Sequence, residues 1–413
     1  MVESHPPTVI RRHTPEFRRA NIAFFLSAFA IFATLYSVQP LLPIFAEEFA
    51  LDAGASSLSL SVTTATLAVS LLFASLVSDR VGRKPLMVWA ILITGFLGLL
   101  LPFAPNWQSL IVIRTLMGIT LSGLPGVAMV YLAEELDPDA LGFSMGLYIG
   151  GTAIGGMSGR LISGVLADWI TWRPALLVLG IMIAAAAIAV VLLLPTPRNS
   201  ARSRLGLRDL GRLISIQFKD EGLPWLFLSA FLLMGCFVTL YNYAGFRLAL
   251  PPFALSHTVI SAIFLVYLLG SASSTWAGDL AQRLGRRKVY WTLVLTMAIG
   301  VALTMVPSTP VIILGLAITT IGYFAAHGIA SAWVARRALV GKAQASAIYL
   351  FAYYLGSSLL GTLGGYAWTA WGWNGVMLVS GGAALAALLV AFRLFHLAPL
   401  SIPEKPPEPP AGV

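Results

Sequence analysis

The sequence predicts an all-α membrane protein with twelve transmembrane helices in two pseudo-symmetric six-helix bundles. Of its 413 residues, 58% are hydrophobic and only 10% are charged, too few charges to cover the surface of a soluble protein. Apolar runs long enough to cross a bilayer, about 20 residues each, recur along the whole chain. The two halves of the chain also share sequence features in the same order.

The apolar runs define the predicted spans. We place them at 20–45, 56–77, 86–104, 108–133, 141–166, 173–194, 224–249, 257–278, 289–307, 310–335, 346–368 and 373–396. This assignment divides the chain into a tail (1–19), a first bundle (20–194), a linker (195–223), a second bundle (224–396) and a proline-rich tail (397–413). Residues 207–218 of the linker are expected to form a short surface helix.

The distribution of positive charge predicts the orientation in the membrane. With the N-terminus inside, 22 of the 26 Lys and Arg residues fall on segments of the inner side or at their edges. This bias is the positive-inside rule, so both termini are expected to be cytoplasmic. The net charge of +9 therefore needs no nucleic-acid partner. The lone Cys236 excludes an intramolecular disulfide, and we expect no metal or other cofactor.

An internal duplication is visible in the fifth and eleventh spans. Four residues recur at a constant offset: Tyr148, Gly155, Gly164 and Trp172 match Tyr349, Gly356, Gly365 and Trp373. The segment SDRVGRK at 78–84 likewise aligns with AQRLGRRK at 281–288. Two similar bundles can rock about their interface and expose one central site to either side of the membrane in turn.

The loop 76–85, LVSDRVGRKP, carries the most specific motif. It resembles the loop between spans two and three of the major facilitator superfamily of secondary transporters, whose pattern is G-x-x-x-D-R-x-G-R-(R/K). Ser75 stands here in place of the leading glycine. Arg114 and Gly118 resemble a second motif of that family, and residues 146–164 resemble its glycine-rich antiporter motif without the usual proline. The chain is most similar to bacterial twelve-span efflux permeases of the sugar-efflux and drug-resistance type.

The resemblance implies a conformational gate at the cytoplasmic side. We expect a network of Asp79 and Arg83 with Glu134 or Glu135 at the end of span four. The second copy of the loop keeps the leading glycine but has Gln282 in place of the aspartate. The predicted gate residues are Asp79, Arg80, Gly82, Arg83, Glu134, Glu135, Gly278, Arg283, Gly285 and Arg286.

Three ionisable residues of the predicted spans are considered for a functional role. Arg114 is costly there, by about 2.5–3.5 kcal/mol on insertion scales. It either snorkels to the headgroups or, as the family match favours, serves proton coupling or binds an anionic group. His327 changes charge near neutral pH, so a proton switch and an ordinary hydrogen-bonded histidine are equal alternatives. Arg160, placed near the outer end of span five, is expected to snorkel.

Polar and aromatic residues on the spans that line the cavity in this family are predicted to contact substrate. They are Tyr36, Gln39, Tyr148, Tyr241, Asn242, Tyr267, Tyr349 and Tyr353. Pro40 and Pro43 predict a bend in the outer part of span one. The glycines of span five are expected to permit close packing across the two halves, at a hinge; they are Gly146, Gly150, Gly155 and Gly159.

The predicted function is secondary active transport of a small molecule. None of the 17 Asp and Glu residues falls in the middle of a predicted span, which disfavours a cationic substrate. We expect a monomeric, proton-coupled exporter of a neutral or anionic compound in the bacterial cytoplasmic membrane, driven by the proton gradient. A sugar or organic-acid importer of the same fold is the alternative. A membrane-embedded enzyme is remote, because we find no paired intramembrane carboxylates.

Overall fold

A computed structural model describes residues 9–199 and 206–397. Within these ranges the chain is helical, apart from connecting segments and one isolated bridge between Ile10 and Leu136. The predicted tails and linker fall partly outside the described residues, at 1–8, 200–205 and 398–413.

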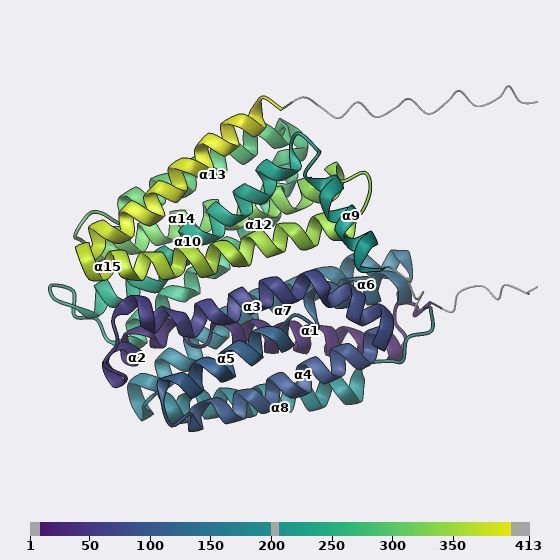
Figure 1. Cartoon of the computed structure of the whole chain (residues 1–413), viewed down its shortest axis with the longest axis horizontal. Coiled ribbons are helices and arrows are strands. Elements are labelled where there is room, and N and C mark those ends of the chain that lie inside the picture. Colours follow the sequence, from purple (N-terminus) through teal and green to yellow (C-terminus); the bar gives the residue numbers. More distant parts are fainter. Residues whose placement is uncertain (1–8, 200–205, 398–413) are drawn as a thin grey trace, which may run out of the picture.

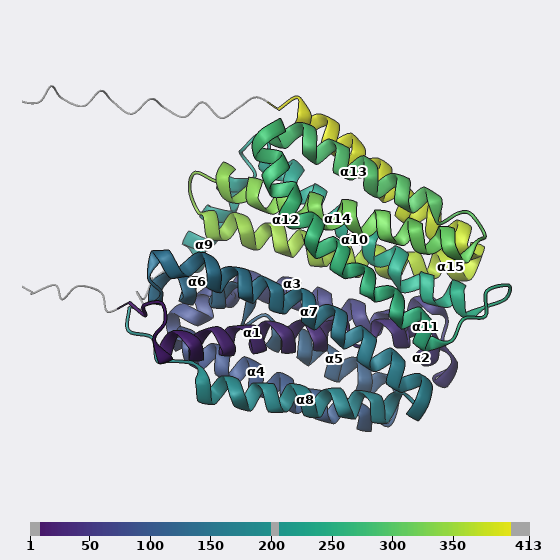
Figure 2. The ribbon, with the colours of Figure 1, turned by 180° about the vertical axis from the view of Figure 1, so that it is seen from behind.

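The helices form two layers that correspond to the two halves of the chain (Figures 1 and 2). The first half contains α1 (Pro15–Tyr36), η1 (Gln39–Leu41), α2 (Leu42–Glu48), α3 (Ala53–Val81), α4 (Arg83–Leu100), η2 (Leu101–Phe103), α5 (Trp107–Leu121), α6 (Pro125–Glu135), α7 (Pro138–Ile170) and α8 (Trp172–Leu193). The second half contains α10 (Leu223–Ala249), α11 (His257–Ala262), η3 (Ile263–Val266), α12 (Tyr267–Leu284), α13 (Arg286–Leu303), α14 (Thr309–Arg337) and α15 (Lys342–Phe395). Between them lies α9 (Leu207–Gln217), the surface helix expected in the linker.

Ten helical segments of the described chain are long and apolar enough to cross a membrane. Large apolar side chains such as Trp89 and Phe96 are more than half exposed on the outer surface, as lipid contact requires. α15 covers the last two predicted spans and has a non-helical Gly372 between its arms. α13 covers the ninth predicted span but is not among the ten. The chain is thus a multi-pass membrane protein, while twelve spans and cytoplasmic termini remain predictions.

The first and fourth predicted spans are among those that are interrupted. α1 ends at Tyr36, and the chain continues through η1, which contains Pro40, into α2, which has Pro43 in its first turn. The bend expected from these prolines is therefore present. The fourth span was predicted as one helix but is divided into α5 and α6, because Pro125 opens a new helix after the break at residues 122–124.

The two halves are hydrogen-bonded to each other at one end of the molecule. We call this the distal end, and the opposite end, which carries α9, the linker end (Figure 1). Among the described residues, four hydrogen bonds cross between the halves. Gln39 donates to Asn242 over 2.8 Å, and Ser358 donates to the carbonyl of Ser61 over 2.8 Å. Thr258 donates to Asp168 through its hydroxyl (2.7 Å) and its backbone amide (3.1 Å). No ion pair joins residues 9–199 to residues 206–397.

The span-five glycines pack differently from our expectation. A Cβ atom on Gly155 would lie 2.3 Å from the carbonyl oxygen of Phe29, and one on Gly159 would lie 2.4 Å from that of Ala33. Both contacts are with α1, so these glycines allow close packing inside the first half, not across the two halves. Gly146 and Gly150 have no atom within 4 Å of such a Cβ. They face open space, so a hinge role through packing does not apply to them.

Candidate functional site

A cavity of about 560 Å³ lies between the two halves. It is lined from the first half by α1 and α7 and from the second by α10, α12, α14 and α15. Gly146, Thr275 and Leu350 line it close to the linker ends of their helices. On its other side lie the hydrogen bonds of the distal end and a separate small space of about 10 Å³. The lining of the cavity therefore extends towards the linker end, and the contacts between the halves lie on its distal side.

Arg160 of α7 is the one Arg or Lys among the residues that line this cavity. Its side chain is 2% exposed, and its guanidinium carbon lies 3.9 Å from the ring centre of Tyr36 and 4.8 Å from that of Tyr267. Nε donates to Gln39 over 2.5 Å, and Nη1 donates to the carbonyl of Gly156 over 2.7 Å. No carboxylate is among the lining residues. A buried cation is thus held by aromatic faces and neutral acceptors only.

The prediction that Arg160 snorkels to the membrane surface was wrong. The predicted span ends at residue 166, but α7 continues to Ile170. Arg160 is therefore ten residues from the helix end, about 15 Å at the 1.5 Å rise of an α-helix, which is close to the middle of a bilayer.

Arg114 occupies a different position from the one its predicted role requires. It is fully buried between helices, and its guanidinium donates to the carbonyls of Ser59 (2.7 Å), Thr34 (3.0 Å) and Leu35 (2.8 Å). These carbonyls belong to α1 and α3, so Arg114 fastens α5 to both helices. It does not line the cavity. Snorkelling, the alternative to a functional role for Arg114, does not occur, and Arg160 has the position that we predicted for an anion-binding Arg114.

His327 of α14 does line the cavity. Its Nδ1 is 2.9 Å from the hydroxyl of Tyr349, and its ring lies 4.7 Å from that of Tyr353. Tyr323, which was not predicted, stacks on Phe237 and donates to the hydroxyl of Tyr353 over 2.7 Å. Two hydrogen-bonded pairs, Tyr323 with Tyr353 and His327 with Tyr349, therefore lie on the second-half side of the cavity. A proton-transfer role for His327 remains a prediction.

The predicted substrate-contacting residues separate into three groups. Tyr36, Tyr267 and Tyr353 line the cavity. Gln39 and Tyr241 line the small distal space, where Asn242 bonds to Gln39. Tyr349 and Tyr148 lie behind the wall, the first bonded to His327 and the second packed on Phe24. Sequence reasoning missed the apolar part of the wall, which consists of Phe32, Met234, Phe237 and Phe324. These side chains carry no signal that separates them from ordinary membrane-facing residues.

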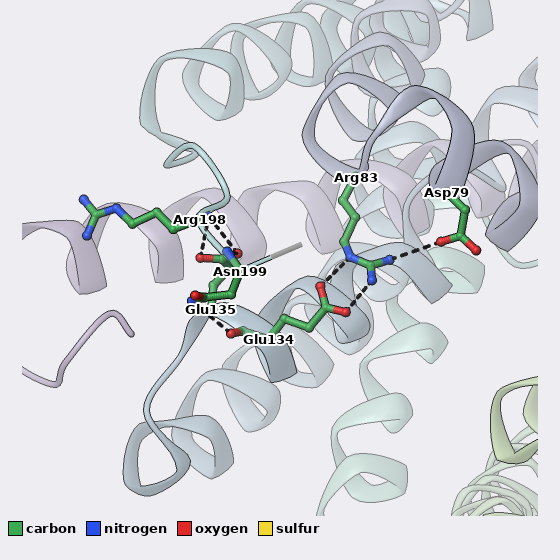
Figure 3. A network of polar contacts seen from close by, with 6 residues as sticks. All are labelled: Asp79, Arg83, Glu134, Glu135, Arg198 and Asn199. Carbon is green, nitrogen blue, oxygen red and sulfur yellow. Dashed lines mark hydrogen bonds and ion pairs between the residues drawn. The ribbon is translucent and has the colours of Figure 1, made fainter. Parts of the chain in front are cut away.

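The predicted gate is present in the first half as an ion network (Figure 3). Arg83 donates through Nε to Glu134 over 2.6 Å and through Nη2 to the other carboxylate oxygen. Its Nη1 is 4.0 Å from Asp79, so this pair is weaker. Glu134, rather than Glu135, completes the network. All three residues belong to the first half, and the network does not cross to the second half in this conformation.

Glu135 has a separate partner. It is 1% exposed and accepts hydrogen bonds from the backbone amides of Arg198 (2.9 Å) and Asn199 (2.7 Å) at the start of the linker (Figure 3). The end of α6 thus holds the gate with one glutamate and the linker with the next. Arg80 makes no ion pair among the described residues, and Gly82 ends α3 with φ 100°.

The second copy of the gate lacks an ion network. Gly285 ends α12 with φ 91°, but Arg283 and Arg286 make no ion pair in the described part of the chain. Arg286 lies over the ring of Trp333 at 5.6 Å. A Cβ atom on Gly278 would have no neighbour within 4 Å. The described residues also contain no group of three or more side chains suited to hold a metal ion.

The family profile and the relatives that match this chain point to the same protein family. The sequence profile of the Major Facilitator Superfamily matches residues 24–250 and 232–413. The chain is 45% identical to the inner membrane transport protein YnfM of Escherichia coli, over 95% of this chain and 94% of that protein. It is 42% identical to the MFS-type transporter YybF of Bacillus subtilis, over 94% and 95% of the two chains.

Solved structures agree in fold. A bacterial homologue of the human lysosomal transporter Spinster, in an inward-facing and unoccupied conformation, aligns with a TM-score of 0.72 at 15% identity, over 92% of this chain and 93% of that one. A variant of the nucleoside transporter NupG aligns with a TM-score of 0.74 at 15% identity, over 92% and 100%. At this identity the likeness concerns the fold alone.

Proposed function

This chain belongs to the Major Facilitator Superfamily, and on that basis we propose that it exports a small organic anion from the bacterial cytoplasm in exchange for protons. Transport would proceed by alternating access of the cavity between the two halves. The lining of the cavity extends towards the linker end, which supports a state that loads substrate from the side predicted to be cytoplasmic. The name of YnfM supports placement in the inner membrane. We propose that the chain acts as a monomer.

The observation that carries this proposal is the buried Arg160. A buried charge without an opposite charge is unfavourable, because its lost hydration is not replaced. Tyr36 and Tyr267 offset part of that cost through cation–π contacts. A carboxylate on a ligand would supply the missing charge and accept two hydrogen bonds from the planar guanidinium. An organic cation would instead be repelled.

The remainder of the wall indicates an amphipathic ligand. Ligand pockets of about 300–1,000 Å³ hold small organic molecules, and this cavity is within that range. Its apolar side chains, including Phe32, Phe237 and Phe324, suit an aromatic or branched hydrocarbon body. His327 and Tyr353 suit a second polar group or a transported proton. We therefore favour aromatic monocarboxylates as the substrate class.

Transport into proteoliposomes tests the proposal. The probes are benzoate, neutral benzyl alcohol and cationic benzylamine, each with an imposed pH gradient. We expect benzoate to be carried best and Arg160→Gln to lower its rate at least about tenfold, since removal of one partner from a buried charge pair costs a few kcal/mol. Arg173→Gln is the matched control, because Arg173 pairs with Glu48 on the surface. Preference for benzylamine, or an unchanged rate in Arg160→Gln, would refute an anion site.

Proton coupling is tested with His327→Gln. We expect this variant to exchange benzoate down its gradient but to lose acceleration by a pH gradient. Import by the same fold is the alternative direction. It would appear as accumulation of benzoate on the side that bears the linker, with the proton gradient directed to that side.

A further inference from the structure

Two buried amide side chains meet where the halves of the protein touch. Gln39 follows α1 in the first half, and its Nε2 donates to Oδ1 of Asn242 on α10 of the second half over 2.8 Å. Both side chains are at most 2% exposed. This bridge lies directly on the distal side of the cavity, among the residues of the small distal space. Its position makes it part of the barrier that closes the cavity distally.

Arg160 supports this bridge from the cavity side. Its Nε donates to Oε1 of Gln39 over 2.5 Å, a charge-assisted hydrogen bond. Because the oxygen of Gln39 is occupied by the cation, its amide nitrogen is directed towards Asn242. One side chain thus faces the cavity with its guanidinium and also orients the amide that holds the two halves together.

Two buried polar atoms at or near the bridge lack hydrogen-bond partners. Nδ2 of Asn242 has no hydrogen-bond partner, although it is buried. The hydroxyl of Tyr267, whose ring contacts Arg160, is likewise buried without a partner. An unpaired buried donor is unfavourable, because its lost hydration is not replaced. The closed state therefore contains two donors that a rearrangement, or a ligand oxygen beside Arg160, would satisfy.

We propose that Arg160 couples anion binding to opening of the distal end. This inference rests on the anion site proposed above and adds its mechanism of release. With an empty cavity, the unpaired guanidinium holds Gln39 strongly and keeps it against Asn242. A carboxylate bound at Arg160 and Tyr267 neutralises the guanidinium and draws it towards the cavity. Gln39 then loses its charged donor, the bridge weakens, and the two halves separate at the distal end.

Distal opening that follows anion binding suits an exporter. A carrier that opened distally while empty would return without substrate, and a ligand can favour the distally open state only through different interactions in the two states. The loss of the Arg160–Gln39 bond supplies that difference. The equivalent position of the second half, at the constant offset of the duplication, is Gly361, which leaves room beside Nδ2 of Asn242. The arginine that holds the bridge therefore belongs to the first half alone.

A cysteine reporter at the distal barrier tests the proposal. Ala244 is 5% exposed and lines the small distal space, and the native Cys236 is fully buried. In purified Ala244→Cys protein, the rate of alkylation by a polar maleimide measures opening of this barrier. The chain without the reporter gives the background rate.

The first comparison needs no ligand. We expect Gln39→Leu and Asn242→Leu, each in the reporter background, to be alkylated about three- to tenfold faster than the reporter alone, because each removes the buried hydrogen bond that joins the two halves. Ser229→Ala is the matched control, since it removes a buried bond on the same helix α10 that stays inside the second half. Asn242→Ser is the milder substitution if Leu perturbs folding, as judged by size-exclusion chromatography. Equal rates in all variants would overturn the proposed barrier.

The second comparison adds the probe. Sodium benzoate should accelerate alkylation of the reporter protein, benzyl alcohol should not, and Gln39→Leu should show no further acceleration with benzoate. Benzoate that binds, as measured by calorimetry, without changing the alkylation rate would overturn the coupling and leave the anion site intact. Transport without preference for anions, with the rate differences of the ligand-free comparison preserved, would refute only the proposed function.

Discussion

The loop between α3 and α4 can be compared directly with its copy between α12 and α13. Both turns place a glycine in a backbone conformation that other residues rarely adopt: Gly82 has φ 100° and ψ 150°, and Gly285 has φ 91° and ψ 130°. In each case an arginine begins the next helix directly after the glycine. The backbone of the two loops is therefore alike.

The charges around the two loops differ. Arg83 pairs with Glu134 at the end of α6, but the end of α14 carries Arg336 and Arg337, and Arg286 lies over Trp333 instead. The turn depends only on its own glycine, whereas the network depends on a residue from another helix. The duplication has therefore preserved the local conformation and has left the long-range contact to one half.

The ends of α6 and α14 nevertheless hold the linker in corresponding ways. Glu135 binds the backbone at the start of the linker, through the amides of Arg198 and Asn199. Arg337 donates to Asp220 near the end of the linker over 2.5 Å. One half thus uses a buried carboxylate and the other a buried guanidinium. These two contacts, which we call the linker ties, connect the linker to the ends of α6 and α14.

The largest effect is expected at these ties. Glu135→Ala removes the acceptor of buried backbone amides and should lower the free energy of unfolding by about 2–3 kcal/mol. Arg337→Ala should cost less, because Asp220 still accepts from the amides of Gly222 and Leu223. Unfolding in mixed detergent micelles measures both. Glu16→Ala, which removes an exposed pair with Arg198, is the control; a loss as large as that of Glu135→Ala would contradict a specific tie.

An intermediate and equal effect is expected at the two turns. Gly82→Ala and Gly285→Ala each force a side chain into a conformation that costs about 1–3 kcal/mol. A Cβ atom at Gly82 would be 3.4 Å from Pro85, and one at Gly285 would have no near neighbour, so backbone strain dominates in both. The same unfolding assay should give similar losses. A loss confined to Gly82→Ala would show that the turns are not equivalent.

The smallest effect on stability is expected inside the ion network. Glu134→Gln breaks the two-point contact with Arg83, whereas Asp79→Asn alters a pair 4.0 Å apart. Partly exposed pairs contribute about 0–1 kcal/mol, so both variants should insert and fold. We expect both to slow benzoate transport, Glu134→Gln more than Asp79→Asn. Transport at the parental rate in Asp79→Asn would remove Asp79 from the gate, and a larger defect there than in Glu134→Gln would reverse the order of the two contacts.

Much of the fold was predictable because each membrane helix follows from the hydrophobicity of its own segment of the sequence. Apolar runs indicated the helices, Pro40 and Pro43 indicated the bend after α1, and the polar segment after α8 indicated the linker with its helix α9. The gate motif placed Asp79 and Arg83 beside the end of α6, but the choice between Glu134 and Glu135 required coordinates. Adjacent residues on a helix end point about 100° apart, and only their neighbours decide which one meets Arg83.

The sequence by itself determined the helical membrane fold, the two related halves and the glycine turns, because these follow from hydrophobicity over about 20 residues and from backbone sterics. Only the tertiary structure decided the roles of the two intramembrane arginines. Arg114 and Arg160 are equally costly in an apolar span, and the cost is met by whatever each side chain touches. For Arg114 that is a set of carbonyls between α1 and α3. For Arg160 it is a cavity between the halves, and the packing of helices that lie far apart in the sequence, not the residue type, creates that difference.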